Sequence, residues 1–143
     1  METMPPQEAR RINVFFYGLF MDESLLQSKG ILPRNICLAK LYGYSLRIGE
    51  RATLLQDSSF HVFGVLMSLT HKEIDSLYSD DTLQAYRPEP VITNTNDGRI
   101  LPALCFNLVE PAPNKESNQA YAAKLKSLAV ELGFPEEYTC SIR

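Results

Sequence analysis

The sequence has few of the residues that bind metals or form disulfide frameworks. It contains three cysteines, Cys37, Cys105 and Cys140, without a CxxC spacing, and two histidines. An odd set of this kind is a poor basis for a disulfide framework or a zinc site. Cys37 and Cys105 lie in strand-like or apolar segments, where a cysteine commonly acts as a small buried hydrophobe. A cysteine nucleophile paired with His61 or His71 stays open, because such partners meet in space rather than in sequence.

The sequence also lacks an excess of positive charge and a long apolar run. It contains 14 Lys and Arg residues and 17 Asp and Glu residues, which gives a net charge of −3. This charge argues against a nucleic acid or an anionic membrane as partner. No apolar run approaches the roughly 18 residues that a membrane-spanning helix needs. Residues 1–11 are polar and lack the apolar core of a signal peptide. We therefore expect a flexible tail at 1–11, a single domain at 12–143 and a cytoplasmic location.

The most informative stretch runs from Ile12 to Leu26. Residues 12–17 form an apolar, β-branched and aromatic run that predicts one buried strand. Gly18 interrupts this run, and Asp22 followed by Glu23 indicates the start of a short helix. In a strand, turn and helix of this kind, successive backbone N–H groups converge on one point and can hold a phosphate or a carboxylate. An ordinary turn remains the alternative for Gly18.

The rest of the chain alternates short apolar runs with turn signals. Strands are expected at residues 36–46, 52–55, 60–69, 91–93 and 100–108, with a polar turn at 56–59. Thr70 and Glu73 form a capping box that opens a helix ending near Leu77. A C-terminal helix begins near Ser117, carries Tyr121 on its apolar face and closes at Gly133. Strands and helices do not alternate regularly, which favours an α+β domain with a curled, largely antiparallel sheet.

Five segments in order resemble a known family. They are VFFYGLFMDESLL, Gly43-Tyr44-Ser45-Leu46, Val62-Phe63-Gly64-Val65, the helix ending near Leu77, and Tyr86-Arg87. This order resembles the γ-glutamylcyclotransferase superfamily over roughly residues 12–108. The resemblance implies a small mixed, largely antiparallel β-barrel flanked by helices.

The resemblance also implies an activity. Enzymes of this superfamily convert a γ-glutamyl amine or peptide to 5-oxoproline and a free amine or amino acid, by attack of the α-amine on the γ-carbonyl. The partner expected from the resemblance is thus a small γ-glutamyl substrate, with no metal and no organic cofactor. The oligomeric state stays open.

The same resemblance assigns residues to the substrate site. Tyr17, Gly18, Leu19, Phe20 and Tyr86 match the positions that bind substrate. The usual Ser/Thr-Leu pair after the glycine is replaced by Leu19-Phe20. Backbone N–H groups could still hold a carboxylate there, because they do not depend on the side chain.

A catalytic carboxylate is expected after the second helix. The superfamily carries a glutamate there, in a pattern like Leu-Asp-x-x-Glu-Gly, and Asp81 falls on the position of that glutamate. Two further departures are Thr82 in place of glycine and Phe106 where a strand tyrosine is common. Asp80 and Asp81 could equally form a polar turn that ends the helix. Glu50 and Glu89 are other acidic candidates.

Two classes of function follow. The first is a γ-glutamylcyclotransferase-like enzyme that uses Asp81. The second is a catalytically silent family member that binds a small carboxylate ligand or a protein partner in the same cavity. A structural domain without a pocket is the third possibility.

Overall fold

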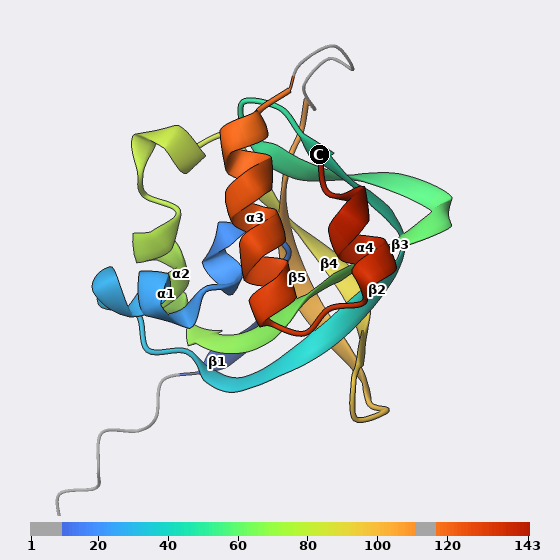
Figure 1. Ribbon diagram of the computed structural model, residues 1–143. Helices are drawn as coiled ribbons and strands as arrows, with labels where there is room; N and C mark the ends of the chain where they lie inside the picture. The colour runs from blue at the N-terminus through green and yellow to red at the C-terminus, as the bar shows by residue number, and fades with distance from the viewer. Residues whose placement is uncertain (1–9, 111–116) are drawn as a thin grey trace, which may run out of the picture.

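A computed structural model describes residues 10–110 and 117–143 of the chain (Figure 1). The elements, in chain order, are β1 (Arg11–Phe16), η1 (Leu19–Met21), α1 (Glu23–Ser28), β2 (Arg34–Ile48), β3 (Ala52–Thr70), α2 (His71–Leu77), η2 (Asp81–Leu83), β4 (Tyr86–Thr95), β5 (Ile100–Leu108), α3 (Gln119–Glu131) and α4 (Glu136–Ser141). The first strand begins at Arg11, one residue earlier than expected. Residues 1–9 of the expected tail lie outside the described residues.

The five strands form a closed barrel in the order β1-β3-β2-β4-β5. Strand β1 pairs antiparallel with β3, from Arg11 opposite Thr70 to Phe16 opposite Val65. It also pairs in parallel with β5, and this contact closes the barrel. The other neighbouring strands are antiparallel. The prediction of a small mixed, largely antiparallel barrel flanked by helices is therefore confirmed.

Strand β1 is buried on both faces. Val14, Phe15 and Phe16 are at most 3% exposed, although successive side chains of a strand point to opposite sides. One face therefore contributes to the barrel interior, and the other is covered by neighbouring elements. This explains why the run is continuously apolar instead of alternating.

The expected turn at residues 56–59 was wrong, because residues 52–70 form one strand. Tyr42 pairs with His61 and Tyr44 with Gln56, so β3 carries extra residues between these two pairs. Gly43 marks the same irregularity on β2, with a φ of +86°. The polar residues 56–59 bulge outward while the backbone stays extended. These residues are polar because they are largely exposed to solvent, and the chain does not reverse its direction there.

The capping box of α2 is present with both of its hydrogen bonds. The Thr70 hydroxyl accepts from the Glu73 N–H, and the Glu73 carboxylate accepts from the Thr70 N–H. The same carboxylate accepts from the Leu32 N–H at 2.8 Å and lies 3.8 Å from the Arg11 guanidinium. Glu73 thus ties α2 to β1 and to the segment before β2.

Helix α3 ends as the sequence predicted. Gly133 has a φ of +82°, its N–H donates to the Val130 carbonyl, and the Phe134 N–H donates to the Ala129 carbonyl. These two bonds form a Schellman motif, in which glycine takes the left-handed position at low cost. Across residues 10–110 and 117–143, no helix combines the length and apolar character needed to cross a membrane.

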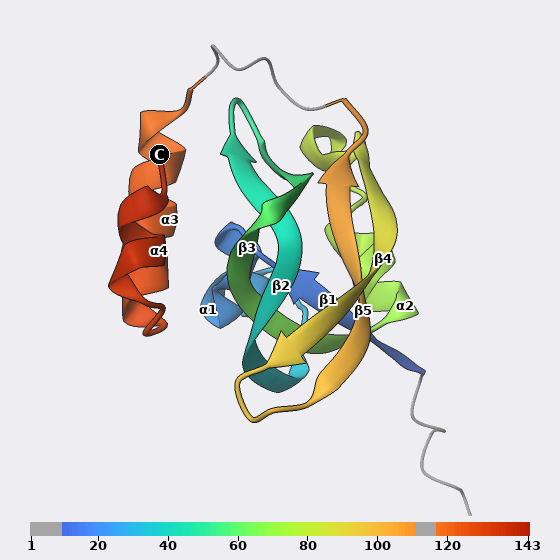
Figure 2. The same ribbon diagram turned by 90° about the vertical axis from the view of Figure 1, so that its right-hand side faces the viewer.

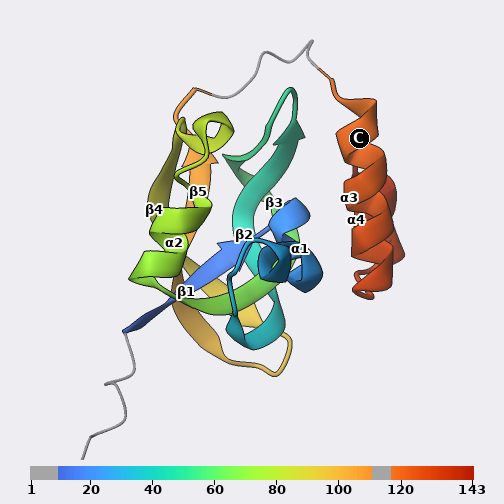
Figure 3. The same cartoon turned by 90° about the vertical axis from the view of Figure 1, so that its left-hand side faces the viewer.

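Helices α3 and α4 lie together on one side of the barrel, away from β4 (Figures 2 and 3). Helix α3 buries Ala122, Leu125 and Ala129. Its N-cap, Asn118, accepts a hydrogen bond from the Tyr121 N–H, and the Asn118 amide donates to the Glu50 carbonyl at 3.5 Å. The first turn of α3 is therefore fixed beside the turn between β2 and β3.

Candidate functional site

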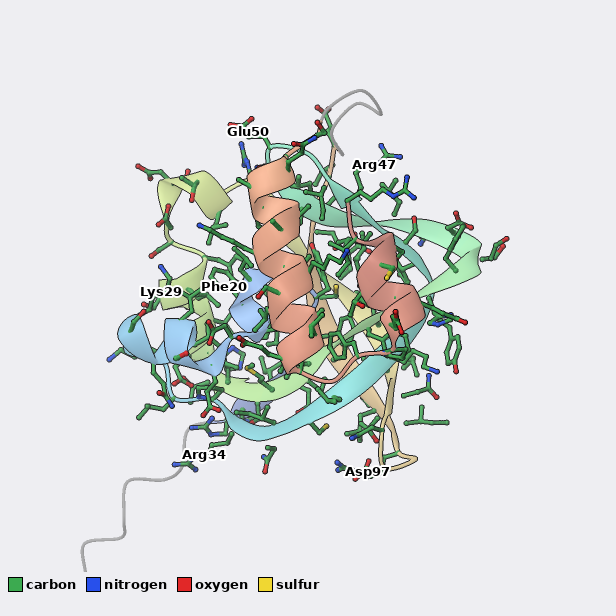
Figure 4. All side chains as sticks on the ribbon, in the orientation of Figure 1. Phe20, Lys29, Arg34, Arg47, Glu50 and Asp97 are labelled. Carbon is green, nitrogen blue, oxygen red and sulfur yellow. The ribbon has the colours of Figure 1, made fainter. Side chains whose placement is uncertain are left out.

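A cavity of about 330 Å³ lies between the loop after β1, the ends of α1 and α2, the β2–β3 turn and helix α3. Eight of the 18 residues that line it are aromatic. Charged residues, among them Lys29, Glu50 and Arg51, also contribute to the wall. Figure 4 labels Phe20 beside α3, Lys29 at the end of α1 and Glu50 near the start of α3. Cavities of this size suit small ligands.

The structure brings the expected substrate-binding residues together. Tyr17, Gly18, Leu19, Phe20 and Tyr86 all line this cavity. The first four follow β1 directly, and Tyr86 is the first residue of β4. The closing of the barrel therefore places the start of β4 opposite the end of β1.

Two tyrosine hydroxyls fix the cavity wall to the barrel. Tyr17 donates to the Phe106 carbonyl at 2.7 Å, and Tyr86 donates to the Ala52 carbonyl. Burial raises the pKa of both hydroxyls well above the usual range, so both stay protonated at neutral pH. The Tyr78 ring stacks on Phe106 with centroids 4.0 Å apart and fills the wall between them.

The loop at Gly18 is in close contact with α3. Gly18 has an ordinary φ of −113°, so the turn itself does not require glycine. A Cβ at this position would instead lie 2.5 Å from the Tyr121 hydroxyl oxygen. The same oxygen accepts a hydrogen bond from the Leu19 N–H at 3.3 Å. The N–H groups of Gly18 and Phe20 have no protein acceptor within the part of the chain that the structure describes.

Asp80 and Asp81 occupy different positions. Asp80 lines the cavity, whereas Asp81 is exposed, lies outside the wall and accepts from the Gln84 amide at 3.2 Å. The Asp80 carboxylate accepts from the N–H and the hydroxyl of Thr82, at 2.9 and 2.7 Å. These bonds, the backbone one first, hold the pKa of Asp80 below its usual value. Of the other candidates, Glu50 lines the cavity and Glu89 does not.

Sequence reasoning missed several residues of the wall. Lys29 and Arg51 give it positive charge, and the Arg51 guanidinium donates to the Thr82 carbonyl at 3.2 Å. Tyr78 and Tyr121 contribute two of its aromatic rings. The helical spacing assigned Tyr121 to an apolar face, and only the packing of α3 on the loop shows its hydroxyl at the site.

The cysteine and histidine candidates lie in other surroundings. Cys105 is fully buried, contacts the Asn107 amide oxygen at 3.8 Å, and burial raises its pKa to about 12. The His61 ring lies on the barrel surface against Tyr42 and Phe63. Because its pKa is raised, the thiol of Cys105 is protonated at neutral pH. The described residues contain no group of three His, Cys, Asp or Glu side chains placed to hold a metal ion.

Comparison with known proteins gives matches in structure. No protein-family model and no curated protein sequence matches the chain. A solved structure described as a gamma-glutamyl cyclotransferase superposes with a TM-score of 0.75 at 21% identity, over 94% of this chain and 89% of the other. An uncharacterized protein from Homo sapiens superposes with a TM-score of 0.75 at 19% identity, over the same shares of the two chains.

A bacterial structure matches over part of its length. YkqA from Bacillus subtilis superposes with a TM-score of 0.73 at 26% identity, over 90% of this chain. The match covers 51% of YkqA, so this chain spans about half of that protein. The sequence resemblance and the barrel topology agree with these superpositions. The superpositions show that the chain has the fold of the solved gamma-glutamyl cyclotransferase.

Proposed function

We propose that the cavity binds a γ-glutamyl amine or peptide and converts it to 5-oxoproline and a free amine or amino acid. The observation that carries this proposal is the loop Tyr17–Phe20 in the wall of a small cavity, with Tyr86 across from it. The free N–H groups of Gly18 and Phe20 supply donors for the α-carboxylate of the substrate. Lys29 and Arg51 add positive charge to the same wall.

The reaction requires little from the protein beyond positioning. The α-amine attacks the γ-carbonyl of the same molecule, the C–N bond of the lactam forms, and the bond to the leaving amine breaks. One proton leaves the attacking nitrogen and one is added to the departing nitrogen. Because the attack is intramolecular, holding the chain in a folded conformation supplies much of the rate. A carboxylate that accepts and then returns the proton completes the cycle.

We place this carboxylate in the Asp80–Asp81 turn. Asp81 matches the glutamate of the family pattern, and Asp80 lines the cavity. The assay is 5-oxoproline release from a panel of γ-glutamyl amino acids and γ-glutamyl amines. The double variant Asp80→Asn/Asp81→Asn is expected to lose activity at least 100-fold, and the single variants assign the role.

Two controls make this assay decisive. Glu50→Gln changes the other carboxylate of the wall, and full activity in the Asp80/Asp81 double variant combined with loss in Glu50→Gln would move the role to Glu50. If Asp80 is the base, its lowered pKa keeps it ionised, so kcat/KM should hold as the pH falls to about 4. Loss of activity between pH 6 and 7 would contradict Asp80.

A silent binding protein is the second candidate, and one observation favours it. The family reaction suits a carboxylate whose pKa burial has raised, whereas Asp80 is exposed and its pKa is lowered. In this case the wild-type protein binds 5-oxoproline or γ-glutamyl compounds without releasing product. Binding measured by calorimetry, together with the absence of turnover across the panel, would establish this second function.

A further inference from the structure

We propose that Arg51 is a specificity-determining residue that binds the carboxylate of the leaving amino acid, so that the site prefers γ-glutamyl amino acids to γ-glutamyl amines. This inference deepens the proposed function and rests on it for the reaction. It concerns the leaving group, at the other end of the substrate from the α-carboxylate that we assign to the Tyr17–Phe20 loop.

The first step is the position of Arg51 between two cavities. Arg51 lies in the turn between β2 and β3 and lines the cavity of the candidate site. Among the described residues, Glu50 and Arg51 also belong to the wall of a second cavity of about 420 Å³. The rest of that wall consists of Ala85, Arg87, Leu108, Val109 and Glu110, in and beside β4 and β5. A substrate that fills the first cavity can therefore extend past Arg51 into the second.

The second step is the charge of Arg51. Its guanidinium donates to the Thr82 carbonyl at 3.2 Å, and no carboxylate in the described part of the chain forms an ion pair with it. Lys29 differs, because its charge, after the bonds from Thr82, helps to hold the pKa of Asp80 below its usual value. Glu50, the acidic neighbour of Arg51, takes part in an interaction of its own. A guanidinium carries five N–H groups, so Arg51 keeps both charge and donors for a ligand.

The third step is the closeness of this charge to the inner cavity. Arg51 is half-buried, and the next residue, Ala52, accepts the hydrogen bond of the Tyr86 hydroxyl. Burial raises the pKa of that hydroxyl, and the positive charge of Arg51 acts against this shift. The charge of Arg51 therefore acts on the Tyr86 side of the cavity. A partly desolvated cation attracts an anion more strongly than a fully exposed one does.

The fourth step is the place of the leaving nitrogen. We assign its protonation to the Asp80–Asp81 turn, where the Asp80 carboxylate accepts from the N–H and the hydroxyl of Thr82. Arg51 donates to the carbonyl of the same Thr82. In a γ-glutamyl amino acid, a single carbon atom separates the leaving nitrogen from the carboxylate carbon. A nitrogen that meets the acid at this turn therefore brings its carboxylate to the side of Arg51.

The chemistry of arginine suits this role. Its planar guanidinium matches the two oxygens of a carboxylate. A γ-glutamyl amine has no carboxylate at this position, so its binding would shield the guanidinium from water without giving it an anion. The second cavity adds room for the side chain of the leaving amino acid. We therefore expect the site to select the carboxylate and to accept different side chains.

The test compares γ-glutamylalanine with γ-glutamylalaninamide, whose leaving groups differ only in a carboxylate or a neutral amide. Release of 5-oxoproline gives kcat/KM for each compound, and calorimetry gives Kd. The wild type is expected to prefer γ-glutamylalanine roughly 10- to 100-fold, the usual effect of hydrogen bonds to a charged group. Arg51→Gln is expected to lower this ratio to about 1 by weakening γ-glutamylalanine, with a far smaller effect on γ-glutamylalaninamide.

A second variant and a matched control accompany this test. Arg51→Lys keeps the charge and loses the planar fork, so its ratio is expected to lie between those of the wild type and Arg51→Gln. The control Arg99→Gln removes an arginine charge elsewhere. Arg99 pairs with Asp97 between β4 and β5, and Figure 4 labels Asp97 and Glu50 at opposite ends of the molecule. Arg99→Gln is expected to keep the wild-type ratio.

The outcomes separate this inference from the proposed function. A wild-type ratio of about 1, a ratio that persists in Arg51→Gln, or an equal loss of both compounds would overturn the role of Arg51. Release of 5-oxoproline would in each of these cases leave the proposed function intact. If Arg51→Gln does not fold, a wild-type ratio in Arg51→Lys would overturn the role of the guanidinium.

Two further results concern the reaction itself. Preferential binding of γ-glutamylalanine without release of 5-oxoproline would support Arg51 and contradict the proposed reaction. A wild-type protein that neither binds nor converts either compound would overturn both.

Discussion

At the scale of single residues, two glycines mark close approaches with different partners. Gly18 faces the end of a side chain, the Tyr121 hydroxyl. Gly64 faces backbone, because a Cβ there would lie 2.4 Å from the Phe16 carbonyl oxygen and 2.5 Å from the Phe15 ring. A side-chain end can move aside, whereas the backbone of a neighbouring strand cannot. The two positions should therefore respond differently to an added methyl group.

We expect Gly18→Ala to fold and to lose about 1–2 kcal/mol of stability, because the methyl group displaces the Tyr121 hydroxyl from the Leu19 N–H. The measurement is urea unfolding of a double-mutant cycle. In the Tyr121→Phe background the contact with the hydroxyl oxygen is absent, so Gly18→Ala should cost clearly less there. Equal costs in the two backgrounds would show that the contact with Tyr121 is not the cause.

At the scale of elements, Glu73 connects three segments. Its carboxylate caps α2 through Thr70, accepts from the Leu32 N–H and lies near Arg11. Partial burial acts to raise the pKa of Glu73, but the hydrogen bonds from the Thr70 and Leu32 N–H groups outweigh it and lower the pKa. The folded protein therefore favours the ionised form.

This shift has a defined consequence for stability and pH. A lowered folded pKa means that the stabilisation is present above the unfolded pKa of about 4.3 and is lost as the pH falls through the folded value. Glu73→Gln should cost about 1–2 kcal/mol at pH 7. The difference from the wild type should shrink as the pH falls below about 4. A difference that is constant from pH 7 to pH 3 would contradict this explanation.

The elements also show which features a sequence can predict. The strand at 12–17, the capping box at Thr70 and the end of α3 at Gly133 all depend on residues within a few positions of one another. The continuity of β3 through residues 56–59 depends on the pairing of β3 with β2 on both sides of this segment. Local composition cannot predict this pairing. The polar composition of residues 56–59 therefore predicts a turn, although the strand continues through them.

The residues of the candidate site also fall into those that a local motif predicts and those that only the folded chain brings to the cavity. The loop Tyr17–Phe20 and Tyr86 follow from a motif, and the structure places all of them on one cavity. Tyr121 reaches the cavity from the C-terminal helix, and its periodic spacing with Leu125 is that of any buried helix face. Which of two adjacent aspartates faces the cavity depends on the backbone of a turn, because one residue changes the direction of the side chain.

At the scale of the whole molecule, closure of the barrel depends on β1 lying close to both β3 and β5. We expect Gly64→Ala to cost about 3 kcal/mol or more, because the methyl group meets the β1 backbone and the rigid ring of Phe15. Thermal unfolding followed by circular dichroism checks this. Ser68→Ala, on the same strand and against the same partner, is the control for side-chain change and should cost much less. A stable Gly64→Ala protein would mean that β1 and β3 can separate without opening the barrel.

The hydrogen bond from Tyr17 to the Phe106 carbonyl joins residues 89 positions apart. Contacts of such long sequence separation carry a large loop-closure entropy and form late in folding, whereas the β2–β3 hairpin is local and forms early. During synthesis, β5 must leave the ribosome before the loop after β1 gains its final support. Until then the β1–β3–β2 sheet has an open edge on β1. We therefore expect the cavity to be among the last parts of the molecule to form, so that a ligand bound there would stabilise only chains that have already closed the barrel.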